Sequence, residues 1–187
     1  TSGITSNFDM YFFFFLNAKA SVDAGFRTVQ TSGFNDYGSS LEIVEENYNI
    51  VNDMGELASF IMGFHAEYTT SMERMEGIAA LSNKYKSPTF LHNSETAFEV
   101  EECKKRWGKT PTELTNDLGM YEYGGGGYHC VYMDDRDFEI FKQKGLYAVT
   151  NPASNLKLAS GIAPIARYLA EGINLAIGTD GPASNNA

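Results

Sequence analysis

Cysteine, basic residues and long apolar stretches are all scarce in this chain, and each shortage argues against a class of protein. Its 187 residues include two cysteines, Cys103 and Cys130. Two are too few for the disulfide framework of a small secreted domain, and neither lies in a paired metal-binding motif. We therefore expect a cytoplasmic protein, in a reducing compartment.

The chain is acidic, with 14 lysines and arginines against 24 aspartates and glutamates and a formal net charge of −10. Binding through a nucleic-acid phosphate backbone needs a basic surface, so nucleic acid is not an expected partner. The longest apolar run, residues 10–16, is too short to span a bilayer, and no signal peptide is visible. Membranes are not an expected partner either.

The chain does have the composition of one globular domain, with 43% hydrophobic and 20% charged residues. Strands are predicted at residues 4–9, 26–31, 58–64, 88–91, 128–133, 147–150 and 173–178. Helices are predicted at residues 12–24, 41–53, 71–84, 95–107, 134–144 and within 158–170, and residues 108–127 are expected to be a connector. This alternation predicts an α/β fold with a parallel sheet and crossover helices.

The three histidines of the chain each close or follow one of these predicted strands. They are His65, His92 and His129, and Asp180 follows the last strand. In an open, doubly wound sheet such residues would gather at one switch point, whereas all strand ends of a (β/α)₈ barrel face one mouth. We therefore favour a TIM-type (β/α)₈ barrel, incomplete, with about seven of its eight strands present.

Several candidate site residues also have a purely structural interpretation. His65 fits a core histidine with one hydrogen bond, Glu95 an acid at the start of a helix, and Asp180 a turn former. Arg27 lies near the start of its strand, at the wrong end of a barrel for chemistry, and is interpreted as structural. The recurrence at successive strand ends favours one polar pocket.

Several other features are given structural roles. Residues 124–127 are four glycines without the Gly-Lys-Ser/Thr ending of a phosphate loop, and are expected to allow close approach of the backbone. The run Phe12–Phe15 is expected in the core. Solvated helix faces are expected for Glu45, Glu46, Glu99, Glu101 and Glu102.

Five segments together resemble the amidohydrolase superfamily. They are GFHAEYT (63–69), LHNSE (91–95), YHCV (128–131), VTNPASNLKL (149–158) and GTDGPASN (178–185). More narrowly, they resemble the methylthioadenosine/S-adenosylhomocysteine deaminases and related chlorohydrolases. Residues 3–11 also look like the second strand of that barrel. The resemblance implies that residues 1–187 form a partial amidohydrolase-type (β/α)₈ barrel domain.

The resemblance also implies a role for each candidate residue. His92 and Asp180 resemble metal ligands, and Asp180 also moves a proton. His129 resembles the histidine that holds the hydrolytic water, and Glu95 the carboxylate that carries a proton to the substrate ring. His65, together with Glu95, resembles a substrate contact. The implied cofactor is a divalent metal ion, with zinc as first choice and iron or manganese as alternatives.

The implied reaction is deamination of an adenosine-like nucleoside or a related purine or heterocycle. Metal-activated water attacks the amine-bearing ring carbon, and ammonia leaves. An s-triazine-type chlorohydrolase, a guanine-type deaminase and a catalytically dead barrel used as a binding module stay open as alternatives. Self-association into a homo-oligomer is also left open.

One part of the superfamily pattern is missing. The first barrel strand normally carries a His-x-His pair that supplies two metal ligands, and no two histidines here have that spacing. We therefore expect a fragment of a longer enzyme that binds metal weakly and is inactive by itself, because a catalytic zinc site normally has three protein ligands.

Overall fold

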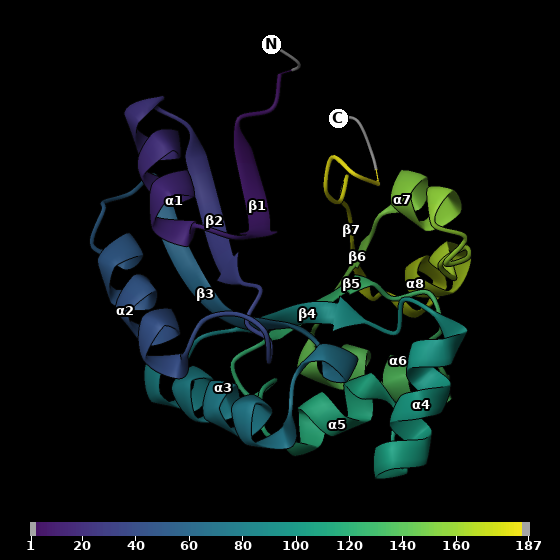
Figure 1. Ribbon diagram of the computed structural model, residues 1–187. Helices are drawn as coiled ribbons and strands as arrows, with labels where there is room; N and C mark the ends of the chain where they lie inside the picture. Colours follow the sequence, from purple (N-terminus) through teal and green to yellow (C-terminus); the bar gives the residue numbers. More distant parts are fainter. Residues whose placement is uncertain (1–2, 185–187) are drawn as a thin grey trace.

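The computed structural model describes residues 3–184, which form a curled, seven-stranded parallel sheet (Figure 1). The strands are β1 (Ser6–Tyr11), β2 (Arg27–Ser32), β3 (Ala58–Ala66), β4 (Thr89–Asn93), β5 (Gly125–His129), β6 (Tyr147–Thr150) and β7 (Asn174–Ile177). Each strand pairs in parallel with the next one along the chain. A doubly wound sheet reverses its strand order, and this sheet does not. The predicted barrel-type winding is confirmed.

Helices cover the outer face of the sheet (Figure 1). They are α1 (Phe14–Asp23), α2 (Leu41–Asn52), α3 (Met72–Tyr85), α4 (Ala97–Trp107), α5 (Pro111–Asp117), α6 (Asp135–Lys144), α7 (Pro152–Lys157) and α8 (Ile165–Glu171), with a 3₁₀ turn η1 (Glu67–Thr69). Among the described residues, no helix has both the length and the apolar character needed to cross a membrane. A cavity of about 760 Å³ is lined by both edge strands, β1 and β7.

The sheet carries an apolar layer on each face. The larger layer lies between strands and helices and includes Phe60 and Phe141. The smaller layer consists of Phe90, Tyr128 and Val149 on three successive strands. Tyr128 pairs with Val149, and Phe90 pairs with Gly126, which lies two residues before Tyr128, so all three side chains lie on the same face. The smaller layer therefore lines the concave side, just before the strand ends that carry the predicted site.

The sequence suggested that residues 108–127 form a connector, but the structure shows that they also contain a helix. They contain α5, which Thr110 caps through a capping box with Glu113 and which has Pro111 in its first turn. A second short helix, α7, begins at Pro152, which the sequence pattern indicated as a strand stop. Proline fits the first turn of a helix because its missing N–H would have no intrahelical partner there.

Strand β5 begins and ends earlier than predicted. It covers residues 125–129, so the glycines form most of the strand, and the predicted extension through residues 130–133 is wrong. A Cβ atom on Gly126 would lie 2.0 Å from the backbone oxygen of Tyr147, and one on Gly125 equally close to that of Thr89. Glycine is needed here because neighbouring backbones approach closely, although it has low strand propensity.

We predict that Gly126→Ala lowers the free energy of unfolding by about 3 kcal/mol, because the added methyl group forces β5 away from β6. Urea denaturation of the full-length protein measures this effect. Gly38→Ala is the matched control, since its Cβ would meet no atom closer than 3.4 Å and no positive φ is involved. Equal stability of the two variants would contradict the steric explanation.

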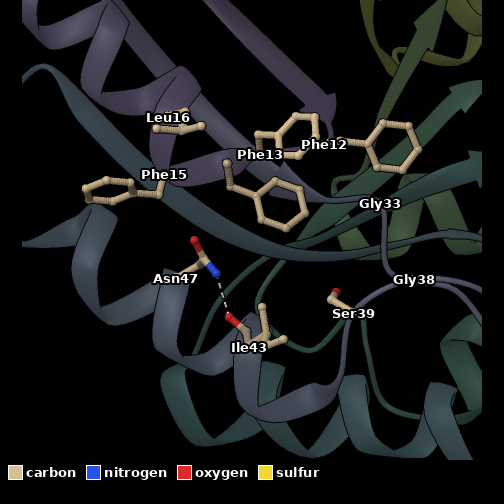
Figure 2. Close-up of a pocket in the computed structure, with 10 residues that line it drawn as sticks. Phe12, Phe13, Phe15, Leu16, Gly33, Gly38, Ser39, Ile43 and Asn47 are labelled. Carbon is tan, nitrogen blue, oxygen red and sulfur yellow. Dashed lines mark hydrogen bonds between the residues drawn. The ribbon is translucent and has the colours of Figure 1, made fainter.

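The run Phe12–Phe15 is not core, contrary to the sequence-based expectation. Only Phe14 is buried, whereas Phe12 and Phe13 are 60% and 71% exposed. Phe12 and Phe13 precede α1, which begins at Phe14, and successive helix residues point about 100° apart, so Phe14 packs on Phe60 of the sheet while Phe15 points away. Figure 2 shows the remaining phenylalanines around an apolar pocket of about 400 Å³ beside α2.

Candidate functional site

The predicted site residues come from the carboxyl ends of four strands. His65 lies in β3, His92 in β4 and His129 at the last position of β5. Asp180 follows β7, and Glu95 lies between β4 and α4. Because all strands are parallel, these ends meet at one edge of the sheet. Arg27 begins β2 at the opposite end, where it is exposed, as expected.

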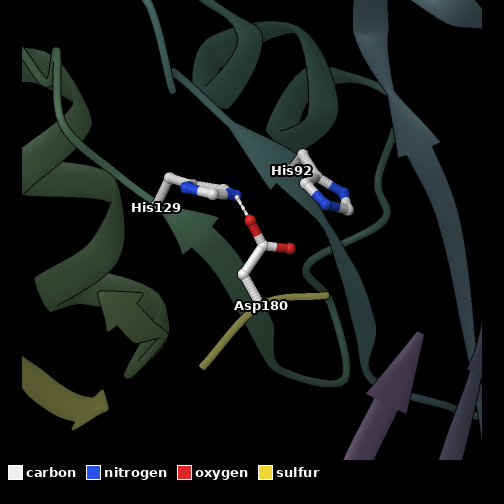
Figure 3. Close-up of side chains that lie close together, drawn as sticks. All are labelled: His92, His129 and Asp180. Atoms are coloured by element: carbon white, nitrogen blue, oxygen red, sulfur yellow. Dashed lines mark ion pairs between the residues drawn. The ribbon is translucent and has the colours of Figure 1, made fainter. Parts of the chain in front are cut away.

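His92, His129 and Asp180 form a compact set of metal-donor atoms. One donor atom from each residue lies within 4.8 Å of the others. Figure 3 shows the His129 ring facing the Asp180 carboxylate, with His92 beside them. The His92 and His129 rings are stacked with centroids 5.3 Å apart. Imidazole nitrogen and carboxylate oxygen are ligands that suit zinc and similar divalent ions.

The hydrogen bond that His92 makes leaves its other ring nitrogen able to bind a metal ion. Its Nδ1 lies 3.0 Å from the backbone oxygen of His65, which can only accept, so Nδ1 carries the proton and Nε2 is left with a free lone pair. Burial, reinforced by the neighbouring His65 and His129, lowers the pKa of His92 to about 3. The ring is therefore neutral at physiological pH, as metal binding requires.

Asn155 fixes the tautomer of His129 in the same way. Asn155 Oδ1 lies 2.7 Å from His129 Nδ1, and both residues are buried. His129 Nε2 then faces two carboxylates, 3.8 Å from Glu95 Oε2 and 4.0 Å from Asp180 Oδ2. The sequence interpretation gave Asn155 no role, although it lies within the segment at residues 149–158. Its partner is 26 residues away, beyond the reach of local patterns.

Asp180 is held by donors on both of its oxygens. Ser154 and Ser184 donate to Oδ2 at 2.5 and 2.9 Å, and the Gly181 N–H donates to Oδ1 at 2.7 Å. Burial raises the pKa of Asp180, but these three hydrogen bonds and His129 outweigh it and hold the pKa below its usual value. Asp180 therefore stays ionised, as a ligand or proton acceptor must.

Glu99 does not belong to a solvated helix face, contrary to the sequence-based expectation. Its side chain is buried, and its carboxylate accepts the backbone N–H groups of Ser94 at 3.2 Å and of Glu95 at 2.7 Å. The contact is local: the loop that follows β4 turns back over the first turn of α4, so its N–H groups lie four and five residues from Glu99. Burial raises the pKa of Glu99 to about 7 despite these hydrogen bonds.

We predict a pH-dependent stability from Glu99. Because its folded-state pKa of about 7 exceeds the ordinary 4.5, its contribution is full below pH 4.5 and is lost as pH rises to 7. The loss is about 3 kcal/mol. Glu99→Gln should flatten this part of the stability profile in denaturation at pH 5, 6, 7 and 8. The exposed Glu101→Gln is the control, and identical profiles for both variants would contradict the assignment.

His65 lies beside the metal-donor set. Its ring centroid is 4.6 Å from that of His92. Thr69 Oγ1 donates to the Ala66 carbonyl, so it accepts from His65 Nδ1 at 2.9 Å and leaves Nε2 free. Burial lowers the pKa of His65, while Glu95 opposes that shift. The structure thus brings all five predicted residues into one neighbourhood.

The backbone at these strand ends adopts unusual conformations. Ser94, His129, Cys130 and Asp180 all have positive φ angles between 49° and 68°. Such conformations cost about 1–3 kcal/mol each for non-glycine residues and cluster at functional sites. Here they turn the chain sharply after β4, β5 and β7.

Comparison with known proteins identifies relatives that match nearly the whole chain. The chain is 41% identical to the 5-methylthioadenosine/S-adenosylhomocysteine deaminase of Caldanaerobacter subterraneus, over 99% of this chain and 44% of that protein. It is 38% identical to the 5'-deoxyadenosine deaminase of Methanopyrus kandleri, with the same coverage. An adenosine deaminase from Xanthomonas campestris with bound zinc superposes with a TM-score of 0.89, at 28% identity over 97% of this chain and 43% of that one.

The chain spans about 44% of the length of the curated relatives it matches. The model of the amidohydrolase family matches residues 1–187. The resemblance drawn from five short segments is therefore confirmed over the whole sequence, and the chain belongs to the amidohydrolase family.

Proposed function

We propose that the protein carrying this sequence is a metal-dependent aminohydrolase that releases ammonia from an adenosine-type nucleoside. The observation that carries the proposal is the convergence of His92, His129, Asp180 and Glu95 at one edge of the sheet. Relatives named as deaminases of adenosine-type nucleosides match nearly the whole chain, which supports the substrate class. The two buried, unpaired cysteines fit a cytoplasmic setting.

The donor set fits a divalent metal, and we propose zinc. His92 Nε2 and an Asp180 oxygen would hold it, since His92 has its second nitrogen satisfied by a backbone carbonyl as metal-binding histidines usually do. When bound, such a metal supplies water of lowered pKa. The related adenosine deaminase that contains zinc supports this choice.

The residues around the donor set supply the proton transfers that hydrolytic deamination needs. Asp180 is ionised and can accept one proton of the attacking water, while the His129 ring can hold that water through Nε2 by accepting a hydrogen bond from it. Glu95 faces His129 Nε2 from another direction, and we assign it to take the other proton of the attacking water and pass it to the ring nitrogen next to the reacting carbon. Proton return from Asp180 to the amine completes the release of ammonia.

Solved structures with the same fold but other activities give no reason to prefer one of those activities for this chain. A guanine deaminase at 23% identity and an atrazine chlorohydrolase at 22% share the fold. A catalytically dead barrel would have no physical need for ionised and neutral donors arranged within 4.8 Å. Adenosine-type deamination is therefore the function we propose.

A substrate panel on the full-length protein tests the proposal. Adenosine, 5'-deoxyadenosine, methylthioadenosine and S-adenosylhomocysteine are compared with guanine and atrazine, with ammonia and chloride release as the measurements. We expect ammonia from at least one adenosine-type nucleoside and its loss after treatment with a chelator. Turnover of guanine or atrazine alone, or activity unaffected by metal removal, would contradict it.

A further inference from the structure

The carboxylate of Glu95 has a hydrogen-bond donor on a distant loop. Ser160 Oγ donates to Glu95 Oε1 at 2.8 Å, although the two residues are 65 positions apart. Oε2 of the same carboxylate faces His129 Nε2 at 3.8 Å. The two oxygens of Glu95 therefore have different surroundings, one bound to a hydroxyl and the other directed toward the metal-donor set.

Ser160 is held firmly enough to orient a neighbour. It is only 3% exposed. Its backbone N–H donates to the Asn155 carbonyl at 2.8 Å, between Ala159 and Gly161, which both have positive φ. A side chain whose backbone is fixed this way loses little further entropy when it makes a hydrogen bond.

The same segment also fixes His129. Asn155 binds the Ser160 backbone through its carbonyl and His129 Nδ1 through its side chain. Residues 155–160 thus hold the two groups, His129 and Glu95, on either side of the 3.8 Å gap between them. The Glu95 main chain is fixed separately, by the bond from its N–H to Glu99.

We infer that Ser160 is a positioning residue for Glu95. Its hydroxyl occupies Oε1 and so directs Oε2 toward the reacting atoms. Without this bond the Glu95 side chain, which is 15% exposed, would be free to adopt other rotamers. The inference rests on the proposed deaminase function and adds to it a residue that acts through Glu95 and does not itself touch substrate.

Kinetics of the full-length enzyme test the inference. Ser160→Ala should lower kcat roughly 10- to 100-fold, the effect expected for one hydrogen bond to a charged group, with little change in KM. Ser160→Thr, which keeps the hydroxyl, should restore most of the loss. Metal content should stay near the wild-type value, because the Ser160 hydroxyl donates to Glu95 and not to any of the three metal donors. Ser160→Cys guards against poor folding of the alanine variant. Its side chain has a volume similar to that of serine but is only a weak hydrogen-bond donor, so it should lose activity to the same extent as Ser160→Ala.

Two controls separate a positioning role from a structural one. Ser82→Ala removes another buried serine hydroxyl, which donates to the Ser87 carbonyl, and should lower stability without lowering kcat. In a Glu95→Ala background, Ser160→Ala should cause no further loss, because its effect passes through Glu95. If the wild type is active, two results would overturn the inference but not the proposed function. They are an unchanged kcat in Ser160→Ala and an additive loss of kcat in the double variant. A wild type that releases no ammonia would instead overturn the proposed function, and the inference with it.

Discussion

Glu95→Gln in the full-length protein should lower kcat for deamination by about 10²- to 10⁴-fold while leaving the metal in place. Glutamine matches glutamate in size and can still accept the hydrogen bond from Ser160, but it cannot transfer a proton. Glu95 lies outside the metal-donor set of His92, His129 and Asp180. The expected loss is therefore one of proton transfer, with KM and metal content changing little.

Steady-state kinetics and elemental analysis on the same preparation measure the two quantities separately. Glu101→Gln makes the same chemical change at an exposed position of α4 and should leave kcat unchanged. Loss of metal together with activity in Glu95→Gln would assign Glu95 to the metal site. Full activity of the Glu95→Gln variant would show that Glu95 does not transfer a proton in the reaction.

His92→Leu should abolish both metal binding and turnover. Leucine has similar bulk to the ring but offers no lone pair, so the site loses the nitrogen that the His65 carbonyl leaves free. Mutating an outer residue that only orients a metal ligand typically costs 10- to 100-fold in affinity, and removing a ligand should cost more than about 100-fold. Metal content after dialysis and a zinc titration measure the change.

His65→Asn is the matched control for this variant. His65 contributes a backbone carbonyl to His92, and that carbonyl survives the substitution. The variant should keep its metal and raise KM, since His65 is assigned to substrate contact. Retention of stoichiometric metal by His92→Leu would show that His92 is not a ligand. Loss of metal from His65→Asn would place its side chain among the ligands.

The sequence missed the short helices α5 and α7, but it was sufficient for the order of the strands, the longer helices between them and the parallel winding. These follow from short-range signals, namely apolar runs of strand length and helices stopped at Gly108, Gly145 and Gly172, where the positive φ favours glycine. The same signals failed where other contacts overrode them. Residues 125–127 form a strand only because neighbouring backbones pack against them, and burial of Glu99 depends on a loop that folds back over α4.

The sequence also singled out His65, His92, Glu95, His129 and Asp180 as candidates, because they lie at or just after strand ends that a parallel sheet brings to one edge, and the family resemblance gave each a role. It could not supply their partners. Asn155 on His129 and Ser160 on Glu95 are 26 and 65 residues from the groups they hold. Which nitrogen carries a proton and which way a carboxylate turns are set by such long-range hydrogen bonds, so only the tertiary structure decided them.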